Sequence, residues 1–432
     1  MNHKIWISFA VATALAVMPA NAEVIAIVGG TVHTLSDQGT LPEATVLIED
    51  GEILNVQKGR VTPKGARVID ASGKVVTPGI FAAHSGLGLV EVSAESSTVD
   101  SAQRGAAFGA SFDIADAYNP ASTLIDINRA EGVTRAVVLP NPAWPEDGQP
   151  GGGVISGQAA VVHLGDSDDF LVARGAAIVA HLGESGGYVS TGSRAAALLA
   201  LTTALQDAID YGQYTAAYDA GARREYSVSK QDLDALQGVI RGDVPLYLSA
   251  DRASDIRVAI DLADRFGLSI IIVGGAEAWQ IAERLAASNV AVMFSPIANL
   301  PGSFDSLSSS MENARVLQEA GVRLIIADGD THNLRNLKQL AGNAVAHGLP
   351  WIEGLRAITA TPAKVLGLGD RFGTLATGMA ADVVVWDGDP LEVTTFPEHV
   401  FINGESVSLE NRQTQLRDRY LNLKDAQPPA YR

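Results

Sequence analysis

The feature that most constrains the fold of this chain is an alternation of apolar runs with amphipathic segments over residues 244–296. The run VPLYLSA is followed by SDIRVAIDLADRFG, then LSIIIVGG, AEAWQIAERLAASN and VAVMFSP. Ile256, Ala259, Ile260 and Ala263 recur at helical spacing, whereas the strand-length runs are almost continuously apolar, as parallel strands covered on both faces require. The pattern predicts successive βα units and a buried parallel sheet.

Counting such runs along the chain predicts eight strands, at 76–84, 133–140, 159–164, 176–182, 244–250, 268–274, 290–296 and 322–328. Eight strands that alternate with helices favour an α/β fold of the (β/α)8 TIM-barrel type over residues 79–368. Residues 85–130 and 141–158 are too long and too rich in Gly and Pro for simple connections. We therefore expect both to form excursions over one mouth of the barrel.

Both ends of the chain have a different character, with short β-branched runs separated by turn residues. Residues 24–76 contain Asp50-Gly51 between two apolar runs, which is hairpin chemistry, and the same pattern returns in GMAADVVVWDGD and HVFINGESVSL. Neither piece is large enough to bury a core alone. We expect residues 23–78 and 369–408 to form one composite β-sandwich, followed by a charged C-terminal helix and tail over 409–432.

The first 22 residues have the pattern of a secretory signal peptide. His3 and Lys4 precede an apolar run from Ile5 to Met18, and Ala20-Asn21-Ala22 forms a small-residue cleavage site. A membrane anchor is the competing interpretation, but the run is shorter than the ~20 residues that a spanning helix needs. The prediction is an exported, periplasmic protein without a membrane anchor.

Charge and composition exclude several kinds of partner and site. The chain has 31 Lys and Arg against 49 Asp and Glu, a formal charge of −18 that repels phosphate backbones, so no nucleic-acid partner is expected. It has no cysteine, which excludes disulfides, thiolate ligands and cysteine nucleophiles. A metal ion would need His, Asp, Glu or modified Lys as ligands.

Three segments carry a family resemblance: VVTPGIFAAHSGLGLVEV, GLPWIEGLRAITATPAKVLGL and FGTLATGMAADVVVWDGDPLEV. They resemble the amidohydrolase superfamily, and within it the secreted imidazolonepropionase-like group. The resemblance implies hydrolysis of amide or cyclic-amide C–N bonds in a small-molecule or peptide-like substrate. It also implies one or two divalent metals such as zinc at the C-terminal barrel mouth, which polarise the carbonyl and activate water.

The resemblance assigns family positions to residues at the ends of the predicted strands. The first is a His-x-His motif that reads His84-Ser85-Gly86 here, so His84 is retained, and Ala82 stands where the family usually has Asp. The strand-eight aspartate, which moves the proton from the attacking water to the leaving group, corresponds to Asp328, with Asp330 as the fallback. His84 and Asp328 are the predicted remnant of the metal site.

The other family ligands correspond to residues without a suitable donor. The strand-four lysine, which is carboxylated when it bridges two metals, corresponds to Val179, and the histidines of strands five and six correspond to Ser249 and Gly274. A carbamate cannot form on valine. With Gly86 also lacking a donor, we expect metal to be absent or substoichiometric.

Two local alternatives and one displaced metal site also follow from these residues. His84 alone fits a structural histidine at a strand end better than a working ligand, and Asp328 is equally compatible with a helix cap. His181 and Asp251 each lie two residues beyond a lost position and therefore share its inward face. Zinc or manganese would find enough N and O donors in a displaced site formed by His84, His181, Asp251, Asp328, Asp330 and His332.

Two arginines near the predicted barrel mouth, Arg252 and Arg335, are candidate substrate-binding residues. A guanidinium group binds a carboxylate bidentately, although such arginines also neutralise neighbouring aspartates. The sequence thus predicts an amidohydrolase-like hydrolase with a depleted metal site. The alternative is a catalytically silent paralogue that binds a small ligand, or that acts as a subunit beside an active amidohydrolase paralogue or in a homo-oligomer.

Overall fold

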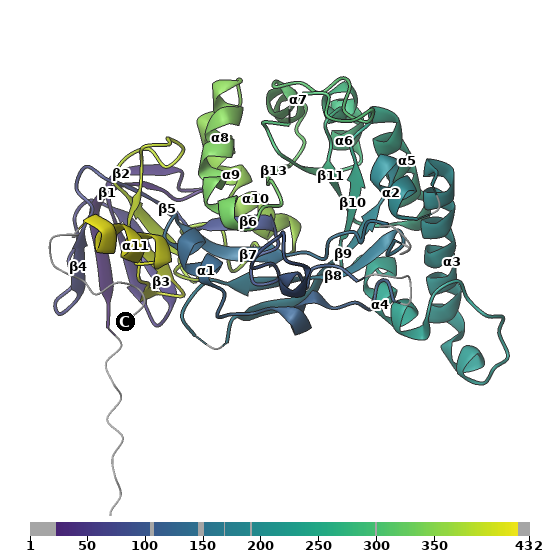
Figure 1. Cartoon of the computed structure of the whole chain (residues 1–432). Coiled ribbons are helices and arrows are strands. Elements are labelled where there is room, and N and C mark those ends of the chain that lie inside the picture. The colour runs from purple at the N-terminus through teal and green to yellow at the C-terminus, as the bar shows by residue number, and fades with distance from the viewer. Residues whose placement is uncertain are drawn as a thin grey trace, which may run out of the picture.

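The computed structural model describes residues 23–103, 108–145, 151–167, 169–190, 192–298 and 300–421. The signal peptide predicted for residues 1–22 and the end of the tail, 422–432, lie outside these ranges. Two eight-stranded sheets dominate the molecule, one of them formed from both ends of the chain (Figure 1). Within the described ranges no helix is both long and apolar enough to cross a membrane.

The first sheet confirms the composite β-domain, because strands from both ends of the chain intermix in it. In Figure 1 the purple N-terminal strands lie beside the yellow C-terminal ones. The strands pair in the order β16-β15-β14-β5-β1-β2-β3, and β4 pairs with β1. Their bounds are β1 (Ile25–His33), β2 (Thr40–Glu49), β3 (Glu52–Lys58), β4 (Arg67–Asp70), β5 (Val75–Pro78), β14 (Val383–Trp386), β15 (Pro397–Ile402) and β16 (Glu405–Ser406).

Local sequence accounts for two features of this sheet. Asp50 and Gly51 join β2 to β3 with φ values of 51° and 84°, the positive pair that a type I′ hairpin turn requires. In β14 successive side chains alternate between two cores. Val383 and Val385 pack in the core of the β-domain, whereas Val384 and Trp386 pack on the barrel side.

The second sheet is the nearly closed eight-stranded barrel, which confirms the TIM-barrel prediction. Its strands pair in sequence order from β6 to β13, and these two strands are the edges of the sheet. They are β6 (Ile80–Ser85), β7 (Val133–Val138), β8 (Ile155–His163), β9 (Leu171–His181), β10 (Leu246–Ala250), β11 (Ile270–Gly274), β12 (Ala291–Phe294) and β13 (Leu324–Ile326).

The expectation of an all-parallel sheet was wrong for one strand. β8 pairs antiparallel with both β7 and β9, whereas the other neighbouring strands of the barrel are parallel. β8 also begins at Ile155, so residues 155–158 belong to the barrel and not to the predicted excursion 141–158. Ser156, Gly157 and Gln158 interrupt the apolar pattern and hide the start of the strand.

The predicted strand 76–84 is two strands in different sheets. β5 belongs to the composite domain and β6 to the barrel, and Gly79 separates them. A Cβ at position 79 would lie 2.2 Å from the side chain of Thr134, so only glycine permits this close crossing. Apolar residues on both sides of Gly79 make the two strands look continuous in the sequence.

Helices cover the outside of the barrel, and side chains fill its inside. Ile256, Ala259, Ile260 and Ala263 of α5 are buried as predicted. The helices and 3-10 turns are η1 (Ser96–Thr98), η2 (Ile114–Ala117), α1 (Thr123–Arg129), α2 (Gly183–Val189), α3 (Arg194–Asp219), α4 (Lys230–Ile240), α5 (Ala253–Phe266), η3 (Ala278–Ile281), α6 (Ala282–Ala287), α7 (Asn313–Glu319), η4 (His332–Asn336), α8 (Leu337–Ala346), α9 (Trp351–Ala357), α10 (Ala360–Val365) and α11 (Arg412–Leu421).

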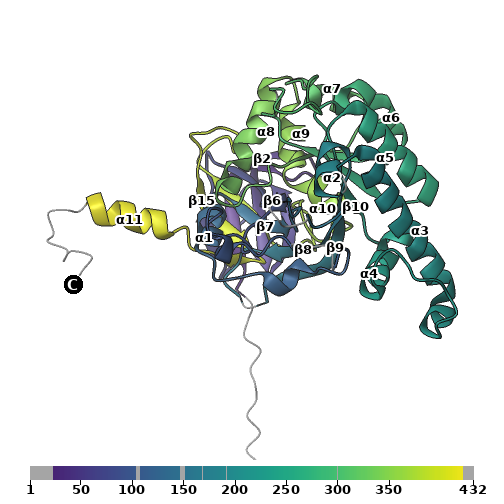
Figure 2. The same cartoon turned by 45° about the vertical axis from the view of Figure 1, so that its right-hand side comes forward.

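The barrel interior is a packed core that includes Phe81, Val179, Tyr247, Ile271 and Met293. Because these side chains fill the space between the strands, a ligand can enter only at a mouth of the barrel. Figure 2 shows α11 extending away from the rest of the molecule, and none of its residues is buried.

Candidate functional site at the barrel mouth

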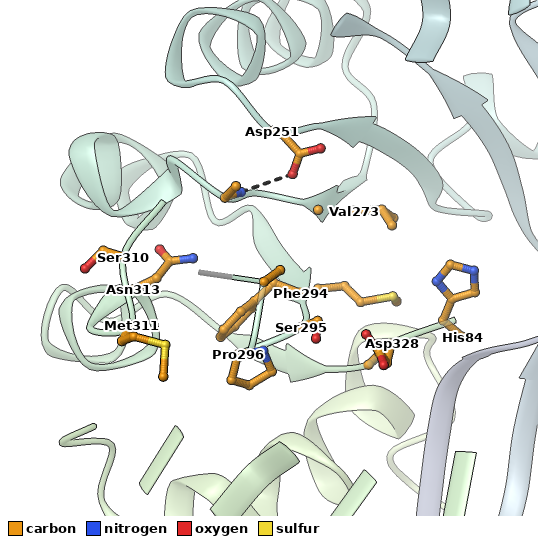
Figure 3. A pocket seen from close by; sticks show the side chains of 15 residues that line it. His84, Asp251, Val273, Phe294, Ser295, Pro296, Ser310, Met311, Asn313 and Asp328 are labelled. Atoms are coloured by element: carbon orange, nitrogen blue, oxygen red, sulfur yellow. Dashed lines mark hydrogen bonds between the residues drawn. The ribbon is translucent and has the colours of Figure 1, made fainter. Parts of the chain in front are cut away.

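A cavity of about 180 Å³ lies at the C-terminal ends of β6, β10, β11, β12 and β13 (Figure 3). We call it the mouth pocket. Three of the predicted site residues, His84, Asp251 and Asp328, line it. Active sites of (β/α)8 enzymes lie at this end of the barrel, since loops from several strands converge there.

His84 lies near the end of β6 and faces the mouth pocket. The ring packs against Gly329, where a Cβ would come within 2.9 Å of His84 Cε1. Gly329 has a φ of +67°, a conformation that glycine adopts without strain. Burial lowers the pKa of His84 to about 4. The ring is therefore neutral at pH 7, and it has no hydrogen-bond partner among the described residues.

Asp328 follows β13 and is an exposed carboxylate at the edge of the same pocket. Figure 3 shows it below His84. Its side chain forms no hydrogen bond or ion pair with the described residues. Asp330 takes the capping role considered for Asp328, because its Oδ1 accepts a hydrogen bond of 3.1 Å from the Asn333 amide. The Asp328 carboxylate thus remains available to a ligand.

Asp251 and Gly274 form one local arrangement on the opposite side of the pocket. A Cβ at Gly274 would lie 2.5 Å from Asp251 Oδ1, so the carboxylate occupies the space that a side chain at position 274 would need. Asp251 Oδ1 also accepts a hydrogen bond of 3.2 Å from the Ala276 amide. Burial, together with the negative charge of Asp305, raises the pKa of Asp251 to about 6.

His181 lies inside the barrel mouth but has no free ring nitrogen. Its Nε2 lies 2.7 Å from Ser156 Oγ and its Nδ1 lies 3.0 Å from Ser249 Oγ. The side chain is 4% exposed. Burial, together with repulsion between the protonated forms of His181 and His84, lowers the pKa of His181 to about 4, so the two rings are neighbours. A histidine that binds a metal needs one ring nitrogen free for the metal, and His181 has neither free in this arrangement.

Two other predicted donors, His332 and Asp330, do not line the mouth pocket. His332 Nε2 lies 3.0 Å from Gln413 Nε2 of α11, and Asp330 binds both the backbone and the side-chain amide of Asn333. Arg335 also binds Gln413, through a 2.9 Å hydrogen bond to its Oε1. These contacts engage His332, the expected donor of a displaced metal site, and Arg335, the expected carboxylate clamp, with Gln413, and neither residue lines the mouth pocket.

Arg252 neutralises an aspartate, which is the alternative considered above. Its NH2 donates a hydrogen bond of 3.0 Å to the Phe304 carbonyl and lies 3.5 Å from Asp305 Oδ1. Asp305 is buried and is also paired with Arg194. The Arg252 guanidinium is therefore held beside the mouth pocket and does not line it.

The six donors of the displaced metal site do not assemble into one cluster. Across the ranges that the structure describes, no group of three or more His, Cys, Asp or Glu residues could hold a metal ion. His84, Asp251 and Asp328 share the pocket, His181 is held by two serines, and Asp330 and His332 have partners of their own. This donor set does not fit a catalytic metal centre, and we derive no step through a metal.

The residue that sequence reasoning missed is Ser156. It lies in a segment expected to be a loop, and a serine beside a glycine carries no signal of its own. Ser249 was considered only as a position that had lost its histidine. Their common role around His181 depends on the pairing of β8, β9 and β10, which places residues 156, 181 and 249 together.

Comparison with known proteins connects this site to one family. A family model described as "Amidohydrolase family" matches residues 251–407. The chain is similar to a solved amidohydrolase from Thermotoga maritima, with a TM-score of 0.79, 25% sequence identity and coverage of 89% of this chain and 99% of that one.

Curated relatives match shorter stretches. An imidazolonepropionase from Maricaulis maris is 32% identical over 156 residues, which is 35% of this chain and 37% of the relative. "Amidohydrolase tasK" from Hapsidospora irregularis is 25% identical over 219 residues, 48% of this chain and 22% of the relative. The chain thus spans well under half the length of these curated relatives.

Proposed function

Because the chain belongs to the amidohydrolase superfamily, in its imidazolonepropionase-like branch, we propose that it hydrolyses an amide or cyclic-amide C–N bond in the mouth pocket. The observation that carries this proposal is the Asp328 carboxylate, which is exposed, without a partner among the described residues, and in the same pocket as neutral His84. The substrate is a small-molecule or peptide-like amide.

Asp328 acts on protons in this proposal. Its carboxylate takes the proton of the attacking water and passes it to the leaving group, which would otherwise depart as an unstable anion. The neutral His84 ring donates a hydrogen bond to the carbonyl oxygen as negative charge develops there. Asp251 on the opposite side orients the N–H groups of the substrate.

The test is hydrolysis of a panel of N-acyl amino acids, dipeptides and cyclic amides by the purified protein. We expect Asp328→Asn to lower kcat by about 10²–10⁴-fold, the usual contribution of a general base. Asp330→Asn separates the two aspartates, because its side chain caps a 3-10 turn and should change kcat less than tenfold. Equal losses in the two variants would contradict the assignment.

We also propose that the metal centre of the family is lost in this protein. The support is the donor set, since His181 is held at both nitrogens and the described residues contain no group of three metal-binding side chains. Protein purified without added metal should then contain well below one equivalent of zinc or manganese. Stoichiometric metal that disappears in Asp251→Ala would contradict the proposal.

The same observation favours a second candidate, a catalytically silent paralogue. In that case the mouth pocket binds a small ligand, or the chain supports an active amidohydrolase as a subunit. No hydrolysis across the panel, together with a co-purifying amidohydrolase, would favour this candidate over the first. Self-association into a homo-oligomer is compatible with both.

Export to the periplasm is a further proposal, supported by Lys4, the apolar run that follows it and Ala20-Asn21-Ala22. The mature protein should begin at Glu23, as N-terminal sequencing of the exported fraction would establish. A product that retains Met1, or that fractionates with membranes, would contradict it.

A further inference from the structure

The backbone around Ser156 is irregular at the point where its side chain meets His181. Ile155 pairs with Ala180 and Gly157 pairs with Val179, so Ser156 is the extra residue of a β-bulge. Gly157 has a φ of +136°, and a Cβ there would lie 2.4 Å from the Phe112 carbonyl oxygen. Bulges redirect side chains and occur often beside active sites. Only glycine at position 157 permits this one.

The two serines beside His181 have different hydrogen-bond distances. Ser156 Oγ lies 2.7 Å from Nε2 and Ser249 Oγ lies 3.0 Å from Nδ1, and both distances are those of hydrogen bonds. In the tautomer that activates Ser156 the proton lies on Nδ1, which donates to Ser249. The lone pair on Nε2 then accepts the hydroxyl proton of Ser156.

This arrangement is the one in which a histidine activates a serine. The base nitrogen accepts from the nucleophile, while the other nitrogen is held by a third group that fixes the tautomer. Here His181 is buried, whereas Ser156 and Ser249 are each partly exposed, although neither serine lines the mouth pocket.

We propose that Ser156 is a nucleophile, that His181 is its general base, and that Ser249 is a positioning residue that holds the imidazole ring. The proposal deepens the function proposed above, because it names the atom that attacks the carbonyl carbon of the same acyl substrates.

The reaction has two balanced halves. Ser156 Oγ bonds to the carbonyl carbon while its proton moves to His181 Nε2, the C–N bond breaks, and that proton passes to the leaving nitrogen. Water then attacks the acyl-serine ester, its proton passes through the Asp328 carboxylate of the proposed function to Ser156 Oγ, which is the leaving group of this half, and the carboxylic acid leaves. His84, the neighbour of His181, has no partner among the described residues and can donate to the oxyanion in both halves.

A serine-directed covalent probe tests this assignment without knowledge of the substrate. The full chain is treated with a fluorophosphonate or with phenylmethylsulfonyl fluoride, and intact-mass measurement with peptide mapping locates the adduct. We expect one adduct per chain, on Ser156. It should be absent in Ser156→Ala and should form about tenfold more slowly in Ser249→Ala, which loses one hydrogen bond to the ring.

The chain offers a matched control in a second serine beside a histidine. Ser167 Oγ lies 3.4 Å from His163 Nε2, which is also bound by the Asp169 carbonyl, so Ser167→Ala should label like the unaltered protein. Labelling that persists in Ser156→Ala, that occurs on Ser249 or Ser167, or that fails in folded protein would overturn the proposal. Folding of each variant is checked by its thermal midpoint.

The outcome separates this inference from the proposed function. Labelled Ser156 without hydrolysis of any substrate in the panel supports the nucleophile and contradicts the hydrolase. Hydrolysis that survives in Ser156→Ala supports the hydrolase and contradicts the nucleophile. Loss of both labelling and hydrolysis in Ser156→Ala, with the fold intact, supports the two together.

Discussion

At the scale of single residues, the site is defined by small residues that each fit a neighbouring side chain. Gly274 has no side chain, and the Asp251 carboxylate lies in the space this leaves, 2.5 Å from where a Cβ would be. Ser249, which the resemblance aligns with a family histidine, forms a hydrogen bond with His181. In the sequence, Gly274 and Ser249 each look like a position without a metal ligand. In the structure, Asp251 needs the space at Gly274, and His181 needs the hydroxyl of Ser249.

Asp251 leads to a prediction on stability. Its pKa is about 6 in the folded protein against an ordinary value of 3.8, so ionisation above pH 6 destabilises the folded state, and the penalty disappears as the pH falls toward 4. Asp251→Asn should raise the free energy of unfolding by about 2–3 kcal/mol at pH 7.5, since one pKa unit corresponds to about 1.4 kcal/mol. Urea unfolding at both pH values measures the effect.

The control for this measurement is Asp243→Asn, which alters an exposed ion pair with Arg241. It should change the free energy of unfolding by less than about 0.5 kcal/mol at either pH. An Asp251→Asn variant that is no more stable than the unaltered protein at pH 7.5 would show that the buried charge carries no penalty.

At the scale of elements, β8 decides the character of the mouth. It runs antiparallel to β7 and β9, and its bulge directs Ser156 toward His181. A parallel strand with a regular ladder would place other residues at this point. The C-terminal helix α11 affects the mouth differently. Its Gln413 binds both His332 and Arg335, and neither of these residues lines the pocket.

At the scale of the whole molecule, one buried ion pair joins the barrel to the composite sheet. Arg135 of β7 is 1% exposed and binds Asp382, which precedes β14 and is 5% exposed. The guanidinium also lies 3.7 Å above the ring of Phe372 and binds Asn403, which follows β15. Residues far apart in the sequence thus meet at a single cation.

Removing this cation should destabilise the junction. Arg135→Met leaves the Asp382 carboxylate buried without its partner, which typically costs about 3–5 kcal/mol of unfolding free energy. The matched control is Arg174→Met, because Arg174 pairs with two aspartates but is 47% exposed, and its loss should cost about 1 kcal/mol or less. Chemical unfolding of the three proteins compares them. Equal effects in the two variants would mean that burial of the pair is unimportant.

The main elements could be predicted from local patterns because their causes are local. Ile256, Ala259, Ile260 and Ala263 mark a helix by spacing alone, and Asp50-Gly51 marks a hairpin turn because few residue pairs tolerate two positive φ values. The two β-rich ends predict a shared sheet because neither could bury a core alone. The resemblance then identified His84 and Asp328, which the fold places in one pocket.

The rest of the site depends on contacts between residues distant in the sequence. The direction of β8 depends on its neighbours, because an apolar run does not indicate whether a strand is parallel or antiparallel to them. Whether His181 is a ligand or a base depends on Ser156 and Ser249, which lie 25 and 68 residues away along the chain. Whether the space beside Gly274 is empty depends on the orientation of the Asp251 side chain. Such relations arise only when the strands pair, because hydrogen bonds and close contacts are properties of positions in space.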